Sequence, residues 1–301
     1  MLILVLFFTL LFFPEHVFFG ATKGLVLWYK TVLPTLFPFI IITSLLSRTN
    51  SFHIISKILS YPLCDILHIS NASLPAVVSG FFCGYPMGAK VIADLIEQKH
   101  ISENEGAYLL SFCNNASPMF WVSYVIYQTF SLEKYVLPVL IIVYLTPIIC
   151  SFGFRNIHKF ERKATLVSCS MINDNFFSVL DQAVGSGCEL ITKIGGYLMI
   201  FSIIAELCLL LPFTENWWYY LVIPSLEMTN GINQIMASPY NTGIQFILVV
   251  FNTSFGGICA FMQTFSVLKN TNISKKVYII EKLITAMVTS LIIFIFFCII
   301  R

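Results

Sequence analysis

Long apolar runs alternate with short polar breaks along most of the 301-residue chain. A helix needs about 20 successive apolar residues to cross the hydrocarbon core of a bilayer, and several runs reach that length. The first run lacks a basic leader and a small-residue cleavage site, so we expect a retained helix rather than a signal peptide. We therefore predict about seven transmembrane helices, at residues 2–19, 24–47, 106–130, 135–153, 188–211, 243–268 and 277–300. Pro34 and Pro38 each remove a backbone donor, so the second of these helices should bend.

Two regions break this pattern because their apolar pieces are too short to span a bilayer. The first surrounds a polar segment at residues 79–88, and the second surrounds residues 224–231. Backbone that leaves its helix at membrane depth has to line a cavity or be buried in protein. Both regions are therefore predicted to be re-entrant helical hairpins, and Pro86 is expected to open the second arm of the first hairpin.

The second half of the chain repeats the order of the first half. Each half shows a span, a hairpin, an interrupted span and a final span, and the interruptions at 114–118 and 251–257 resemble each other. The expected fold is an all-α polytopic membrane protein built on an inverted repeat. Its parts are an N-terminal transmembrane helix (1–22), a first repeat (23–153), a cytoplasmic loop (154–186) and a second, inverted repeat (187–301).

The distribution of positive charge orients this arrangement. With the 154–186 loop in the cytoplasm, most of the 17 lysines and arginines fall on or near the inner side: Arg48, Lys57, Lys90, Lys99, Arg155, Lys159, Arg162, Lys163, Lys193, Lys269, Lys275, Lys276 and Lys282. The remainder fall outside: Lys23, Lys30, Lys134 and Arg301. Cytoplasmic loops carry such an excess of positive charge, so the first hairpin is predicted to enter from the cytoplasmic side and the second from the opposite side.

Composition excludes several classes of protein. The chain is 57% hydrophobic and 11% charged, against about 25% charged residues in soluble domains. The net charge of +2 does not indicate nucleic-acid binding, because the basic residues lie between apolar runs. Nine cysteines are scattered without metal-ligand spacing, so no metal or cofactor is expected. No nucleophile elbow, zinc-protease motif or phosphate-binding loop is present, and we do not expect an enzyme.

Polar residues near the hairpins and interruptions are the candidates for a substrate site. In inverted-repeat transporters, paired discontinuous helices meet near the midplane, and their N-terminal ends suit an anionic group. The first-half candidates are Ser79, Gly80, Lys90, Asn114, Asn115 and Ser117, and the second-half candidates are Glu227, Thr229, Asn230, Asn252, Thr253 and Ser254. The alternative is that these groups only cap broken helices or bond across helices.

Two of these candidates are ionisable and lie beside the hairpins. Lys90 can attract a carboxylate, and Glu227 can bind a coupling proton or cation. The alternative for Lys90 is that its side chain extends to the cytoplasmic interface, since Asp94 and Glu97 follow it along the chain.

The sequence resembles the YlbJ-type sporulation integral membrane proteins. The similarity is strongest in Ser79-Gly80 followed by Gly84-Tyr85-Pro86-Met87-Gly88-Ala89-Lys90, and in Leu110-Ser111-Phe112-Cys113-Asn114-Asn115-Ala116-Ser117-Pro118. Shorter matches at 33–39, 193–196, 226–231 and 254–257 extend it over most of the chain. The family carries the so-called Gate, or nucleoside-recognition, domain, which is also found in nucleoside transporters and ferrous-iron permeases.

The resemblance implies a protein of an endospore-forming bacterium, made in the mother cell and placed in the outer forespore membrane. It also implies a substrate, the small organic anion dipicolinate, which would be moved toward the forespore by alternating access. A nucleoside or metal-ion permease is the alternative within transport, and a non-transporting membrane scaffold for spore assembly is the alternative outside it.

Overall fold

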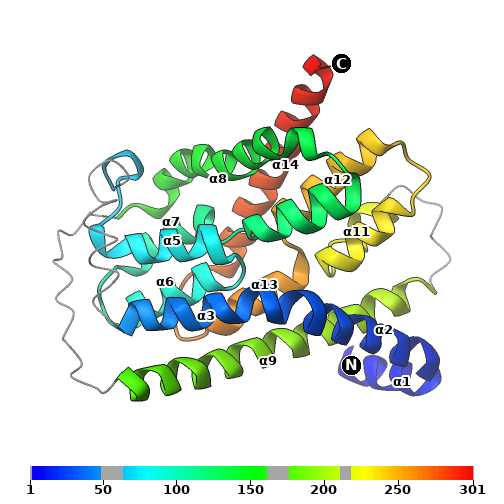
Figure 1. Cartoon of the computed structure of the whole chain (residues 1–301), viewed down its shortest axis with the longest axis horizontal. Coiled ribbons are helices and arrows are strands. Elements are labelled where there is room, and N and C mark those ends of the chain that lie inside the picture. The colour runs from blue at the N-terminus through cyan, green and yellow to red at the C-terminus, as the bar shows by residue number, and fades with distance from the viewer. Residues whose placement is uncertain (1, 49–63, 161–175, 211–217, 301) are drawn as a thin grey trace.

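The computed structural model describes residues 2–48, 64–160, 176–210 and 218–300, and these residues form helices joined by turns and short extended segments (Figure 1). The predicted all-α fold is confirmed for this part of the chain. The α5–α6 hairpin lies toward one end of the molecule and α11 toward the other, with α13 between them (Figure 1). The N-terminus lies at the same end as α11.

The N-terminal helices have other boundaries than the sequence predicts. Helix α1 (Leu2–Phe12) ends before Pro14, and α2 (Pro14–Leu27) then continues through the π-helical segment η1 (Trp28–Val32) into α3 (Leu33–Arg48). The predicted separation near residue 20 is wrong because the break falls at Pro14, which is well suited to open a helix. The π-helical segment precedes Pro34. Because proline has no backbone N–H, it removes one hydrogen bond of the helix at this point.

The first hairpin and the first interrupted helix follow. The short helix η2 (Asn71–Ser73) leads into α5 (Leu74–Cys83), and α6 (Met87–Glu97) returns beside it. After α7 (Glu103–Cys113), the four non-helical residues 114–117 lead into a helix that starts at Pro118 and continues as the π-helical segment η3 (Phe120–Phe130). A turn of η4 (Glu133–Tyr135) then starts α8 (Val136–His158).

The second half shows the same sequence of elements. Helix α9 (Phe176–Cys208) is followed by the short helices α10 (Tyr219–Val222) and α11 (Met228–Met236). Helix α12 (Thr242–Phe255) is separated from α13 (Gly257–Val267) at Gly256, and α14 (Lys275–Ile300) ends the described chain. Because α9 already begins at Phe176, the polar loop is shorter than the predicted 154–186; residues 161–175 lie outside the described residues.

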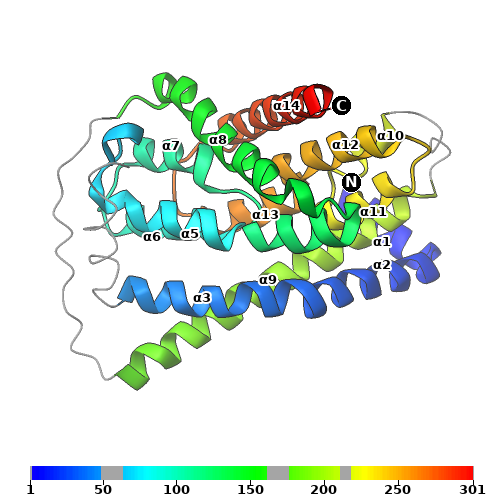
Figure 2. The same cartoon turned by 45° about the horizontal axis from the view of Figure 1, so that its top comes forward.

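Helices α2 and α9 pack closely along one side of the molecule (Figure 2). A Cβ atom placed on Gly24 would lie 2.7 Å from the Cα atom of Met199, and one on Gly20 would lie 2.8 Å from the Cα atom of Ile203. Small residues four positions apart allow the backbones of membrane helices to approach in this way. The two glycines thus bring the first long helix of each half together.

Five helices of the described chain are long and apolar enough to cross a bilayer: Pro14–Leu46, Glu133–His158, Phe176–Cys208, Thr242–Val267 and Lys275–Ile299. Large apolar side chains on these helices are exposed at the protein surface, among them Phe18, Ile141, Ile200, Met262 and Phe294. Such a surface is stable only against lipid. The chain is therefore an integral membrane protein.

Candidate functional site

A cavity of about 240 Å³ lies where both hairpins and both interrupted helices meet. Its wall contains residues from both hairpin tips and both interruptions, namely Cys83, Tyr85, Ser117, Glu227, Thr229 and Gly256. Of the predicted site residues, Ser117, Glu227 and Thr229 line this cavity, and the others lie in its supporting wall or farther away. The site therefore joins segments that are more than 100 residues apart in sequence.

The arms of the first hairpin hold the C-terminal end of α7 between them. A Cβ atom on Gly80 would overlap the carbonyl oxygen of Cys113, and a Cβ atom on Gly88 would lie 2.9 Å from that same oxygen. At the tip, Gly84 has a φ of +80°, and a Cβ atom there would lie 2.7 Å from the backbone nitrogen of Ser117. Gly80 is thus a close-packing residue within α5 rather than a ligand group.

The four non-helical residues after α7 are held by a buried polar network. The Asn114 amide nitrogen donates to Thr264 Oγ1 at 3.0 Å and to Tyr278 Oη at 2.8 Å. The Asn115 amide nitrogen donates to the Phe112 carbonyl at 2.6 Å. A lysine that the sequence analysis placed near the inner surface, Lys282, donates to the Asn114 carbonyl and to Asn115 Oδ1, both at 2.7 Å.

The tip of the second hairpin is capped by its own carboxylate. Glu227 accepts hydrogen bonds from the backbone N–H of Thr229 at 3.0 Å and of Asn230 at 2.8 Å. Glu227 is therefore the N-cap of α11, and the favourable interaction of its charge with the helix N-terminus is already satisfied within the hairpin. The Asn230 side chain points away from the central cavity and donates to Ser202 Oγ at 2.8 Å.

The second interruption is shorter than the sequence predicts. Asn252, Thr253 and Ser254 belong to the last turn of α12, and only Gly256, with a φ of +89°, leaves the helix. The Asn252 amide nitrogen donates to the Met228 carbonyl at 3.1 Å. The prediction of a long unwound segment here was wrong, because glycines that adopt positive φ allow a tighter break than the polar residues before them suggest.

The N-terminal end of α13 is also occupied within the protein. The backbone N–H of Ile258 donates to the Ser225 carbonyl at 2.7 Å, and that of Cys259 donates to the Leu226 carbonyl at 2.9 Å. Together with the Glu227 cap, these bonds satisfy the helix ends that the sequence analysis expected to face an anion. The charge for anion binding has to come from another group.

Several buried polar atoms around the interruptions have no hydrogen-bond partner among the described residues: Ser79 Oγ, Tyr85 Oη, Asn114 Oδ1, Asn252 Oδ1, Thr253 Oγ1 and Ser254 Oγ. Buried polar groups are usually hydrogen-bonded, so a cluster of such atoms calls for an explanation. Tyr85 Oη is the member of this set that also lines the central cavity. It is available to bind a polar group that enters there.

Lys30 supplies a positive charge at the cavity. It lies in the π-helical segment η1, which also places Thr31 on the cavity wall. A second cavity of about 590 Å³ adjoins the first, and Lys30, Thr31, Tyr124 and Thr229 line both. π-Helical turns inside longer helices often occur at functional sites, and this one turns a lysine toward the junction of two cavities.

Lys90 does not take part in the central site. Its side chain is 40% exposed and forms an ion pair with Asp94, one turn later on α6. It lines neither the central cavity nor the adjoining one. The position agrees with the alternative in which this lysine extends toward the surface.

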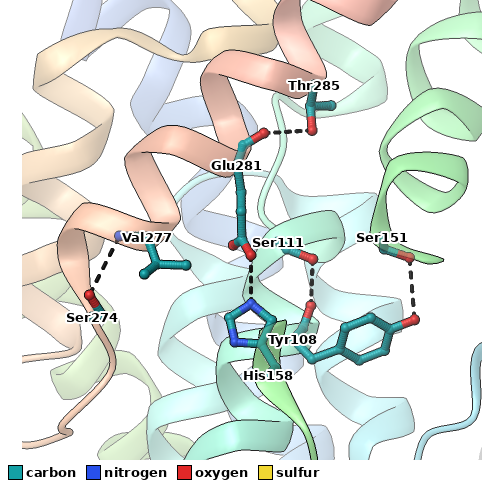
Figure 3. A network of polar contacts seen from close by, with 8 residues as sticks. All are labelled: Tyr108, Ser111, Ser151, His158, Ser274, Val277, Glu281 and Thr285. Atoms are coloured by element: carbon teal, nitrogen blue, oxygen red, sulfur yellow. Dashed lines mark hydrogen bonds and ion pairs between the residues drawn. The ribbon is translucent and has the colours of Figure 1, made fainter. Parts of the chain in front are cut away.

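A separate polar cluster lies at the end of α8, beside α7 and α14 (Figure 3). His158 Nε2 and Glu281 Oε1 are 2.6 Å apart, and both side chains are almost completely buried. The Tyr108 hydroxyl lies 3.3 Å from Ser151 Oγ and so links α7 to α8. These contacts fix the three helices that surround the first interruption.

The chain is 23% identical over 312 aligned residues to the sporulation integral membrane protein YlbJ of Bacillus subtilis (strain 168), and the alignment covers 92% of this chain and 76% of the relative. The chain is thus similar to a YlbJ-type protein over most of its length, as the sequence motifs predicted. No family model matches it. No solved structure matches it either.

The prediction from sequence missed two lysines, Lys30 on the cavity wall and Lys282 behind it. Lys30 reads as an interfacial residue, and Lys282 reads as the last of three basic residues at the start of an apolar helix. A weak signal existed for Lys282, since it lies two turns inside α14, where a charge is costly. For Lys30 the signal was its place one turn before Pro34, where a helix is prone to distort.

Proposed function

We propose that this YlbJ-type protein is a membrane transporter, not an enzyme, and that it moves a small organic anion, dipicolinate. In this proposal α5–α6 and α10–α11 are re-entrant hairpins, and the two Gate-like halves form an inverted repeat. The observation that carries it is the cavity shared by both tips and both interruptions, with Lys30 on its wall. A site at the junction of two repeats is typical of secondary transporters.

The cavity wall suits a planar aromatic anion. Phe120 and Tyr124 both line it, and their rings are stacked with centroids 5.2 Å apart. Aromatic faces of this kind bind flat rings by offset or edge-to-face contact. Lys30 and the hydroxyl groups of Tyr85 and Ser117 provide a cation and hydrogen-bond donors for carboxylates.

The carboxylate of Glu227 in the same wall does not contradict an anionic substrate. Its two oxygens accept the backbone N–H groups of Thr229 and Asn230. The positive end of the α11 dipole therefore offsets part of its charge. Lys30 has no ion-pair partner among the described residues. Its positive charge can therefore neutralise a negative charge of the substrate.

The two adjoining cavities support an alternating-access mechanism. The larger cavity extends from the central one along α2, α9 and α11, toward the end of the molecule that holds the second hairpin. In the proposed orientation this end faces away from the cytoplasm, as the positive-charge distribution predicts. The described conformation would then be open toward the space between the two forespore membranes, and closure of α11 against α2 would open the opposite side.

The substrate and the membrane are tested in spores. An endospore-forming host that lacks its YlbJ-type gene is complemented with this chain, and the dipicolinate content of its purified spores is measured. Spores of the complemented strain should contain wild-type dipicolinate, and spores of the deletion strain should contain far less. A fluorescent fusion should label the outer forespore membrane. Unchanged dipicolinate in the deletion strain would refute the substrate assignment.

Uptake by proteoliposomes separates transport from the other roles considered for this family. The purified protein is reconstituted, and uptake of labelled dipicolinate, a labelled nucleoside and ferrous iron is compared with that of empty liposomes. Saturable dipicolinate uptake supports the proposal. Uptake of the nucleoside or of iron alone identifies another permease, and no uptake together with normal complementation favours a scaffold.

A further inference from the structure

Lys282 is a fully buried cation in the interior of a membrane protein. Its side chain is 0% exposed, two turns into α14. Its ammonium group donates to two oxygens of the first interruption, the Asn114 carbonyl and Asn115 Oδ1. The nitrogen also lies 5.3 Å from the centroid of the Tyr85 ring, which separates it from the central cavity.

No carboxylate forms an ion pair with Lys282 in the described part of the chain. The adjacent Glu281 is bound to His158 on the neighbouring helix. A buried charge without a partner of opposite sign is strongly destabilising unless hydrogen bonds and dipoles compensate it. Here the compensation comes from oxygens at the C-terminal end of α7, which carries the negative end of the helix dipole.

These surroundings have the chemistry of an alkali-metal site. In transporters with discontinuous helices, carbonyl oxygens of the unwound segment and the C-terminal ends of half-helices coordinate the coupling cation. The ligands of Lys282 are a carbonyl oxygen and an amide oxygen from such a segment, together with the face of an aromatic ring. Ammonium and alkali cations both bind oxygens and aromatic faces.

We propose that the Lys282 ammonium group permanently occupies the position of an alkali-metal cation at the α7 interruption. Its charge holds the non-helical residues 114–117 in place, with Tyr85 between it and the central cavity. The consequence for transport, which rests on the proposed function, is that the protein moves its substrate without requiring sodium or potassium ions.

The test uses two variants of the full-length purified protein. Lys282→Ala removes the ammonium group and leaves an oxygen-lined space, whereas Lys282→Met fills the same space with an apolar chain. Exposed Lys276 on the same helix supplies the matched control, Lys276→Ala. Thermal unfolding is measured in detergent with sodium, potassium, ethylammonium or N-methylglucamine chloride at equal ionic strength.

The wild type and Lys276→Ala should unfold at the same Tm in all four salts. Lys282→Ala should lose about 5 °C or more in N-methylglucamine chloride. It should regain about 3 °C in sodium, potassium or ethylammonium chloride, since a ligand that binds only the folded state stabilises it. Lys282→Met should be destabilised as well, but without this recovery.

Equal responses of Lys282→Ala and Lys282→Met to the four salts would overturn the proposal. A Tm of the wild type that rises in sodium or potassium relative to N-methylglucamine would also overturn it, and this measurement needs no variant that folds. Because unfolding does not depend on the substrate, the result stands apart from the transport assay. Sodium-dependent dipicolinate uptake by the wild type would confirm transport while refuting the role of Lys282.

Discussion

The Tyr85 side chain at the tip of the first hairpin lies directly against Gly256, the residue at which the second interrupted helix breaks. A Cβ atom on Gly256 would lie 2.7 Å from Tyr85 Oη and 2.8 Å from Tyr85 Cζ. Similarly, a Cβ atom on Gly257 would lie 2.7 Å from the carbonyl oxygen of Ser225 in the second hairpin. The second break is therefore a contact point for both tips, and its glycines determine how closely the two halves approach.

Gly256→Ala should strongly destabilise the protein. A φ of +89° in the left-handed region costs a non-glycine residue about 1–2 kcal/mol, and the overlap with Tyr85 adds about 1–3 kcal/mol. The free energy of unfolding, or the Tm where unfolding is irreversible, should fall accordingly. Tyr85→Phe should recover only part of the loss, since the ring carbon Cζ remains in place.

Gly196→Ala is the control for this effect. Gly196 lies within α9, and a Cβ atom there would contact nothing within 4 Å. Alanine inside a helix is favoured over glycine by up to about 1 kcal/mol, so the control should be unchanged or slightly more stable. Equal destabilisation by the two substitutions would contradict the role assigned to the Tyr85–Gly256 contact.

The order of elements follows from the sequence because it depends on segment length. Apolar pieces too short to cross a bilayer mark the hairpins, and residues 114–118 mark the first interruption, of which 114–117 are non-helical in the structure. The length of the second interruption could not be obtained in this way. Asn252 is as polar as Asn114, yet it remains helical. The helix breaks instead at Gly256 and Gly257, which both adopt a positive φ.

The residues that face the cavity were less predictable than the segments that form it. A polar side chain can point into the cavity, toward a neighbouring helix or toward lipid, depending on how its helix is rotated about its axis. In a broken helix, the period of 3.6 residues does not determine this rotation for each segment. Asn114 and Asn115 therefore hold the interruption from behind the cavity wall, whereas Ser117 lines the cavity. Lys282 looks like an interfacial lysine until the packing of α14 against α7 is known.

Lys30→Ala should weaken substrate binding without affecting folding. The side chain is exposed to the two cavities and has no ion-pair partner among the described residues, so its removal leaves no buried group unsatisfied. Loss of one charge-assisted contact should raise the KM for dipicolinate by about 10-fold or more. Lys30→Arg should retain most of the affinity, because arginine also binds carboxylates.

Two other lysines provide controls in the same uptake assay. Lys134 is exposed on the side that is predicted to face away from the cytoplasm, and Lys90 is paired with Asp94 away from the cavity. Lys134→Ala and Lys90→Ala should leave the KM within about 2-fold of the wild type, as expected for charges outside the site. A KM for Lys30→Ala no higher than that of these controls would exclude Lys30 from the substrate site.

Gly24→Leu should separate α2 from α9. Its side chain would meet the backbone of Met199, which cannot move aside as a flexible side chain can. Overpacking of this kind costs about 1–3 kcal/mol. It should also break the 2.8 Å ion pair between Lys23 and Glu206, which joins the same two helices at the larger cavity.

The effect is measured by thermal unfolding in detergent and by the rate of dipicolinate uptake. Gly185→Leu on α9 is the matched control, because a Cβ atom there would contact nothing within 4 Å. Lys23→Ala shows how much of the effect comes from the ion pair alone; it leaves the buried Glu206 carboxylate without this partner and should cost about 1–3 kcal/mol. A normal Tm for Gly24→Leu would show that the α2–α9 contact tolerates an added side chain.

The buried His158–Glu281 pair should show strong energetic coupling. His158→Phe leaves Glu281 without its 2.6 Å hydrogen-bond partner in an almost fully buried position and should cost about 1–3 kcal/mol. Glu281→Gln should cost less, since an amide can still bond to the imidazole. In the double variant neither polar partner is left with an unmet charge, so its cost should be below the sum of the single costs by about 1–2 kcal/mol. The exposed Lys193–Glu189 pair on α9, one turn apart, serves as a matched cycle in which the coupling should be much weaker, because solvent screens both charges. Equal coupling in the two cycles would mean that the contacts in Figure 3 do not hold α8 against α14.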